Sequence, residues 1–121
     1  MTTTRSVYAA FTLGALAALV LAACGASAPP PGTPEALYID LGCAKCHGPD
    51  REGQRSGPPL VKIIDHWDED GLLEYLRSPK EFVRSNPRLS YLDEQYPIAM
   101  PAYGTVDEQD LRKLAEFILN S

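Results

Sequence analysis

The spacing of apolar residues near the end of the chain predicts an amphipathic helix. Apolar residues recur there at intervals of three and four positions, at Leu111, Leu114, Ala115, Ile118 and Leu119. Positions with this spacing share one face of an α-helix, which would then face the protein core. Asp107 precedes the run, and an aspartate at such a place caps a helix by accepting hydrogen bonds from free backbone N–H groups. We therefore expect this helix to begin just after Asp107.

Similar signals predict two helices earlier in the chain. Thr33 is a suitable N-cap and Pro34 a suitable first residue for a helix that runs to about Cys46. A second helix is expected over residues 70–77, with three leucines facing inward. The Ser-Pro pair that follows ends this helix, because the residue before a proline disfavours helical backbone.

The remaining segments are predicted to be loops. Residues 50–59 are rich in glycine, proline and charge, and residues 80–84 are expected to form a short turn at most. Residues 86–103 contain three prolines and are expected to be irregular. No stretch shows the alternation of a β-strand, and no internal repeat is visible. The expected fold class is therefore all-α, with three to four helices.

The beginning of the chain has a different pattern. Residues 7–23 are almost wholly apolar and carry no charge, a run that is short for a membrane span and suits the apolar core of a signal peptide. The run ends in Leu21-Ala22-Ala23-Cys24, which resembles the cleavage and lipid-attachment site of bacterial lipoproteins. We expect cleavage before Cys24 and a diacylglycerol on its thiol. The alternative is ordinary secretory cleavage, which would leave Cys24 as a free thiol.

These signals divide the chain into three parts. Residues 1–23 are predicted to be a lipoprotein signal peptide, and residues 24–33 the lipid-attachment cysteine with a linker rich in alanine and proline. Residues 34–121 are left for the folded domain. The expected location is extracytoplasmic, on a lipid anchor at the cell membrane, and on the periplasmic side in a cell with two membranes.

Length and charge exclude some classes of function. The chain has 121 residues, which suits a single domain. Its net charge at pH 7 is −5, so nucleic acid is not expected as a partner. It contains three cysteines and two histidines, so few residues are available to bind a metal or to form a disulfide.

The chemistry is concentrated in one motif, Cys43-Ala44-Lys45-Cys46-His47. Cysteines three positions apart lie on the same face of a helical turn. Two thiols placed in this way can each form a thioether with one of the two vinyl groups of a haem, and the histidine that follows can bind the iron. The motif therefore predicts one covalently attached haem.

Three other interpretations of this motif were considered. A thioredoxin-like redox pair needs a βαβ context, which the sequence lacks. A structural zinc site needs four ligands, and after Cys43, Cys46 and His47 the fourth could only be His66 or a carboxylate. A simple disulfide across the turn is the remaining alternative.

The chain resembles the class I, mono-haem cytochrome c family, in the form of a bacterial lipoprotein. The resemblance extends over about residues 34–120 and has four features in order. These are the helix ending in the Cys-x-x-Cys-His motif and Gly48, the loop Gly57-Pro58-Pro59-Leu60, the segment Ala99-Met100-Pro101, and the C-terminal amphipathic helix.

The resemblance implies a small cytochrome c fold around the haem. The N- and C-terminal helices would cross, with Tyr38 or Leu41 against Leu114 and Phe117. The backbone carbonyl of Pro58 would accept a hydrogen bond from His47, and Leu60 would pack on the haem face.

The iron needs a second axial ligand besides His47, and Met100 is the predicted one. Met1 is lost with the signal peptide, so Met100 is the only methionine of the mature chain. It lies between two prolines, in a loop that could hold its thioether rigidly. The rival ligand is His66, which sits among charged residues and is expected to be exposed.

The function expected from these features is to carry single electrons between redox partner proteins. With both axial positions filled by side chains, the iron has no open position for substrate, so an enzyme is not expected. The alternative is an electron-transfer subunit docked to a larger oxidase, reductase or dehydrogenase complex. A haem-based sensor that exchanges Met100 for a gas is less favoured. The protein would be a monomer or a subunit of a respiratory complex, attached to the membrane through its lipid.

Overall fold

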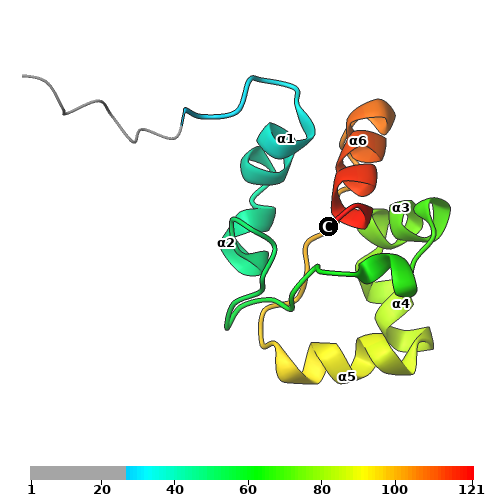
Figure 1. Ribbon diagram of the computed structural model, residues 1–121. Helices are drawn as coiled ribbons and strands as arrows, with labels where there is room; N and C mark the ends of the chain where they lie inside the picture. Colours follow the sequence, from blue (N-terminus) through cyan, green and yellow to red (C-terminus); the bar gives the residue numbers. More distant parts are fainter. Residues whose placement is uncertain (1–26) are drawn as a thin grey trace, which may run out of the picture.

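The computed structural model describes residues 27–121, and the signal peptide and the lipid-attachment cysteine predicted above lie outside them. The described residues form six α-helices and one short 3-10 helix, without a β-strand (Figure 1). None of these helices is long and apolar enough to span a membrane. The all-α prediction is therefore confirmed. In chain order the helices are α1 (Pro34–Asp40), α2 (Cys43–His47), η1 (Ile63–Asp65), α3 (Glu69–Arg77), α4 (Pro79–Ser85), α5 (Pro87–Gln95) and α6 (Glu108–Leu119).

Helices begin where short polar side chains can accept hydrogen bonds from free backbone N–H groups. The Thr33 side chain accepts from the N–H of Ala36 at the start of α1, as predicted. Asp107 accepts from two backbone N–H groups at the start of α6, also as predicted. Asp68 caps α3 and Asn86 caps α5 in the same way.

The first predicted helix is interrupted. It was expected to continue to about Cys46, but α1 ends at Asp40 and α2 begins at Cys43. The reason is Gly42, whose φ of 79° lies in the left-handed region that favours glycine. The motif Cys-x-x-Cys-His therefore occupies a short helix of its own.

The largest difference from the prediction lies between residues 79 and 95. The expected short turn is the helix α4, and the first half of the segment expected to be irregular is the helix α5. Pro79 and Pro87 each stand at the first position of their helix. A proline is favourable there because that position needs no N–H donor and has the backbone angle that proline fixes. The domain thus has more helices than the three to four expected.

Helix α6 holds the core together, because it packs against both α1 and α3. Leu73 and Leu76 of α3 and Leu111 and Leu114 of α6 are fully buried. The rings of Tyr38 and Phe117 meet edge to face, with centroids 5.8 Å apart. This contact between α1 and α6 is the one that the resemblance implied.

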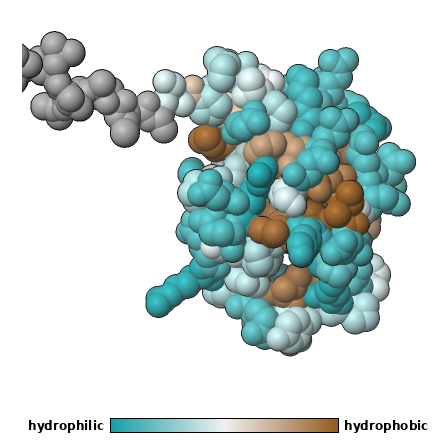
Figure 2. Space-filling model, in the orientation of Figure 1, coloured by the Kyte–Doolittle hydropathy of each residue, from teal (hydrophilic) through white to brown (hydrophobic). Residues whose placement is uncertain are grey.

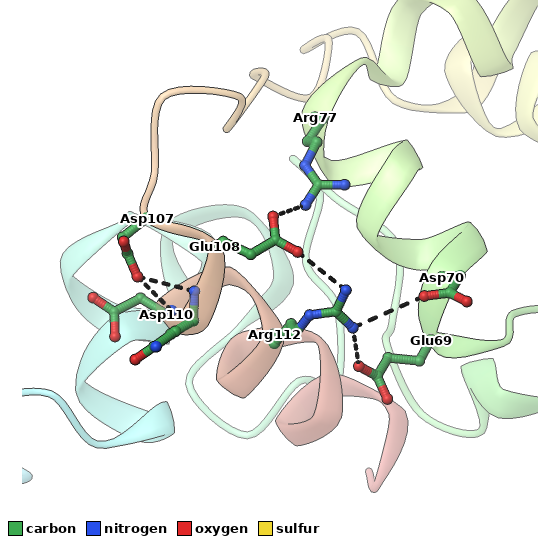
Figure 3. A network of polar contacts seen from close by, with 8 residues as sticks. Glu69, Asp70, Arg77, Asp107, Glu108, Asp110 and Arg112 are labelled. Atoms are coloured by element: carbon green, nitrogen blue, oxygen red, sulfur yellow. Dashed lines mark hydrogen bonds and ion pairs between the residues drawn. The ribbon is translucent and has the colours of Figure 1, made fainter.

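A group of exposed ion pairs adds a second connection between α3 and α6 (Figure 3). Arg112 of α6 lies 2.8 Å from Glu69 and 3.9 Å from Asp70, both at the start of α3. Glu108 of α6 pairs with Arg112 at 3.1 Å and also with Arg77 at the end of α3. Exposed pairs contribute little singly, but several linked pairs fix the relative position of two helices better than one.

Candidate functional site

A cavity of about 610 Å³ lies beside the core. In the space-filling view apolar side chains gather around a hollow between the α1–α2 side and the α3–α4 side of the molecule (Figure 2). Most of the lining residues come from two regions, and the others are Leu41, Gly42 and Tyr75. We call α2 with residues 48–60 the attachment wall, and α4 and α5 with residues 96–103 the methionine wall.

The attachment wall brings the three chemical groups of the motif together. Cys43, Cys46 and His47 all line the cavity. Both cysteines are free thiols, Cys43 buried and Cys46 half-buried. His47 is only 8% exposed. Because all three belong to one short helix, a group bound to them would be fixed to a rigid element.

The orientation of the His47 ring is determined by its Nδ1 atom, which lies 2.7 Å from the backbone carbonyl oxygen of Pro58. Nδ1 must therefore carry the proton and donate it, which leaves Nε2 free to bind a metal. Burial lowers the pKa of His47, and the hydrogen bond to Pro58 only partly offsets this, so the neutral, ligating form is favoured. This is the contact that the resemblance implied for Pro58.

Two glycines allow the loop to lie this close to α2. A Cβ atom on Gly57 would lie 2.8 Å from the carbonyl oxygen of Cys46. Gly53 has a φ of 84°, and its backbone N–H donates to the carbonyl of His47 at 2.8 Å. The loop thus holds both the backbone and the ring of the histidine.

Met100 is half-buried and lines the same cavity from the methionine wall. Its neighbours Ile98, Ala99 and Pro101 also line the cavity. His66, the rival ligand, is exposed at the end of η1 and is not among the lining residues. The structure therefore brings Met100, and not His66, into one cavity with Cys43, Cys46 and His47.

Leu60 ends the loop that holds His47. Its side chain is half-buried against the hydrophobic core and is not among the residues that line the cavity. Its backbone N–H donates to the carbonyl of Arg51 at 2.8 Å, which closes the loop. The packing of Leu60 on the haem face stays a prediction.

The residues that α4 and α5 contribute to the cavity were not predicted, because these segments were expected to be a turn and an irregular stretch. The apolar ones are Pro79, Val83, Leu89 and Leu92. A signal was present, since Leu89, Leu92 and Tyr96 are spaced by three and four positions, as on one face of a helix.

The charges along the cavity are mainly positive, although the chain as a whole is acidic. Lys45, Lys80 and Arg84 line the cavity together with a single carboxylate, Asp93. None of the three cations takes part in an ion pair within residues 27–121. Free cations at the edge of an apolar cavity suit a flat cofactor that itself carries carboxylates, as a haem does.

An all-helical domain with a buried Cys-x-x-Cys-His helix on an apolar cavity defines the class of proteins that attach haem covalently. Comparison with protein families places the chain within that class. The family model for cytochrome c matches residues 35–121, and the chain therefore belongs to the cytochrome c family. Comparisons with curated proteins and with solved structures gave no significant match.

Membership of the family defines the cofactor and the general function. Cys43, Cys46 and His47 fit one covalently bound haem c, and the cavity beside them is apolar and of suitable size for a large flat group. The protein is a haem-based electron carrier, and its partners are redox proteins. Proteins of this family are typically carriers rather than enzymes.

Proposed function

We propose that this protein is a lipid-anchored carrier of single electrons whose haem iron is ligated by His47 and Met100. One observation carries the proposal most directly: Met100 lines the same cavity as His47, whereas His66 does not. Met100 is also the only methionine that remains after removal of a signal peptide. A histidine and a thioether therefore have access to the same bound group.

When bound, the haem supplies an iron centre that gains and loses one electron. The side chains keep that centre unchanged between the two states. The hydrogen bond from His47 to Pro58 fixes the imidazole ring with Nε2 free. The thioether of Met100 is a neutral ligand that raises the reduction potential relative to a second histidine. With both positions filled by side chains, no position remains for a substrate.

The thiols of Cys43 and Cys46 attach the cofactor and do not ligate its iron. Each thiol would add across the C=C bond of one haem vinyl group, with its hydrogen passing to the vinyl carbon, and the two thioethers would hold the cofactor on α2, one helical turn apart. Since α2 is in turn held by the loop through Pro58 and Gly53, the cofactor would be fixed to a wall that is itself held in place. Little then has to rearrange when an electron is transferred.

The ligand assignment is tested by comparing Met100→Ala with His66→Ala in the ferrous holoprotein. Met100→Ala should open an axial position, lower the reduction potential, and allow carbon monoxide to bind. His66→Ala should change none of these, because its side chain is exposed outside the cavity. A His66→Ala protein that turns high-spin, while Met100→Ala stays low-spin, would refute the assignment.

The lipid anchor is proposed from the sequence alone. Its support is Leu21-Ala22-Ala23-Cys24 at the end of an uncharged apolar run, followed by a linker rich in alanine and proline. A diacylglycerol and an N-acyl chain together would anchor the protein stably, since stable attachment requires two or more chains. Cys24→Ser should release the protein from membranes or block its processing. Wild-type protein found entirely in the soluble fraction without added salt would contradict the anchor.

We favour a free-standing carrier over a subunit of a larger complex. The large hydrophobic residues exposed in residues 27–121 are spread over α1, the η1 region, α5 and the methionine wall: Ile39, Val61, Ile64, Tyr91 and Ile98. Scattered exposed hydrophobics are normal on a monomer. Purification from native membranes in mild detergent should therefore yield the cytochrome alone, and co-purification of a stoichiometric oxidase, reductase or dehydrogenase would favour the subunit.

A further inference from the structure

One residue of the methionine wall makes direct contact with the link that leads into the helix that carries the cysteines. Tyr103 is buried, with only 9% of its surface exposed, and it lines the cavity. Its hydroxyl group donates a hydrogen bond to the backbone carbonyl of Leu41, 3.3 Å away. Its backbone N–H donates to the carbonyl of Leu76, in the last turn of α3, at 2.8 Å. Tyr103 is thus connected to two other parts of the fold.

The positions of these contacts along the chain give them their importance. Leu41 lies two residues before Cys43, in the link between α1 and α2, and Tyr103 lies three residues after Met100. The residue next to Met100 is Pro101, whose ring fixes the backbone angle φ. A restraint on Tyr103 is therefore transmitted through a short, stiff span to Met100.

The hydroxyl group is well suited to a permanent structural bond. Burial raises the pKa of Tyr103 well above its ordinary value. The group therefore stays protonated and able to donate at every pH at which the protein would function. A phenylalanine would fill the same buried space but could not donate.

We propose that Tyr103 is a positioning residue, whose hydrogen bond to Leu41 holds the Met100 segment at a fixed distance from the haem-bearing helix α2. This inference rests on the proposed ligation of the iron by Met100. Without the bond, the segment would move away from α2 more often, and the thioether would leave the iron for a larger fraction of the time. Tyr103 does not itself touch the iron in this account.

The test compares Tyr103→Phe with Tyr91→Phe in the full-length ferrous holoprotein. Both substitutions remove one phenolic hydroxyl, but Tyr91 is 61% exposed on α5 and its hydroxyl makes no hydrogen bond within residues 27–121. Tyr103→Phe should raise the rate of carbon monoxide binding about fivefold, the effect of losing one neutral hydrogen bond on an opening equilibrium. After oxidation of the same samples, the absorption band that reports the bond between methionine sulfur and ferric iron should be weaker in Tyr103→Phe. Tyr91→Phe should leave both unchanged.

A second variant alters the span between Met100 and Tyr103 and leaves the hydroxyl group of Tyr103 in place. Ala102→Gly loosens the span between Pro101 and Tyr103, and it should also raise the rate of carbon monoxide binding, so the inference can be tested even if Tyr103→Phe does not accumulate. The inference is wrong if carbon monoxide binds Ala102→Gly, and any Tyr103→Phe protein that accumulates, at the wild-type rate. It is also wrong if Tyr91→Phe changes this rate as much as Tyr103→Phe does. If Met100→Ala allows carbon monoxide to bind and Tyr103→Phe does not change its binding, only the inference about Tyr103 fails. If Met100→Ala does not allow carbon monoxide to bind, the proposed ligation by Met100 is itself wrong.

Discussion

The two walls of the cavity are assembled from different kinds of contact. The attachment wall consists of α2 and the residues that follow directly, and its hydrogen bonds are mostly local, such as those from His47 to Pro58 and from Gly53 to His47. The exception is Arg51, which donates to the backbone carbonyl of Phe117 in α6. The methionine wall consists of α4, α5 and the segment that contains Met100, and it reaches the rest of the fold through bonds that span much of the chain. The bond from Tyr103 to Leu41 joins residues 62 positions apart.

This difference indicates that the two walls have different functions. The attachment wall contains the cysteines that hold the cofactor. The methionine wall contains Met100, the proposed second ligand, and Tyr103 joins this wall to distant parts of the chain. Damage to the first wall should therefore affect retention of the haem, whereas damage to the second should affect ligation. Substitution of a buried residue in either wall should also lower the stability.

The largest effect should follow from removing both thiols. The double variant Cys43→Ser/Cys46→Ser should lose covalent haem completely, because no other cysteine of residues 27–121 can form a thioether. Mass spectrometry of the denatured mature protein measures this directly. The wild type should retain the mass of one haem, and retention of that mass by the double variant would disprove the attachment site.

A smaller effect is expected from Leu89→Ala in the methionine wall. Leu89 is buried, and its truncation should lower the free energy of unfolding by about 2–4 kcal/mol. It should also speed carbon monoxide binding while leaving covalent haem in place. Tyr91→Ala, on the exposed side of the same helix, should change the stability by less than about 0.5 kcal/mol. Equal effects of the two substitutions would argue against α5 as part of the wall.

For the attachment wall, the substitution Gly57→Ala tests how closely the loop packs against α2. The added Cβ would lie 2.8 Å from the carbonyl oxygen of Cys46, and a helix backbone does not yield easily. We expect a loss of about 1–3 kcal/mol in the free energy of unfolding, measured by urea denaturation. Gly104→Ala is a matched control, since its Cβ would meet its nearest neighbour at an ordinary 3.5 Å. The expectation is wrong if the two variants are equally stable.

The smallest effect concerns stability at high pH. Burial raises the pKa of Tyr38 to about 12, and its hydroxyl donates to the carbonyl of Gly48 at 2.8 Å. The unfolded chain loses this proton near pH 10, so the stabilisation is complete below pH 10 and declines as the pH rises toward 12. Denaturation between pH 8 and 12 should show a flatter decline for Tyr38→Phe than for the wild type. Identical slopes would mean that Tyr38 ionises in the fold as readily as it does when unfolded.

The attachment wall was also the part that could be predicted from the sequence. The order of Cys43, Cys46 and His47 defines a helical turn and its chemistry within five residues. The partner of His47, Pro58, followed from the resemblance, and the structure contains that contact. Thr33 and Asp107 marked helix starts because capping is a local interaction.

The methionine wall could be predicted only in part. Elimination among the methionines leads to Met100 as the predicted ligand. Proline signals do not predict α4 and α5, because a proline can either end a helix or, like Pro79 and Pro87, stand at its first position. The break at Gly42 depends on a left-handed backbone angle that composition does not reveal. The hydrogen bonds of Tyr103 could not be predicted, because its partners, Leu41 and Leu76, approach it only in the complete fold.

The central claim is that the iron keeps both of its side-chain ligands, His47 and Met100, while it gains and loses one electron. Voltammetry of the purified native holoprotein, recorded first under argon and then under carbon monoxide, tests this most directly. We predict a single reversible one-electron wave with the same midpoint potential under both gases, because a ferrous iron with both positions filled has no place for the gas. A midpoint that shifts upward under carbon monoxide, or a wave that loses its reversibility, would show an open position on the iron and would contradict the account.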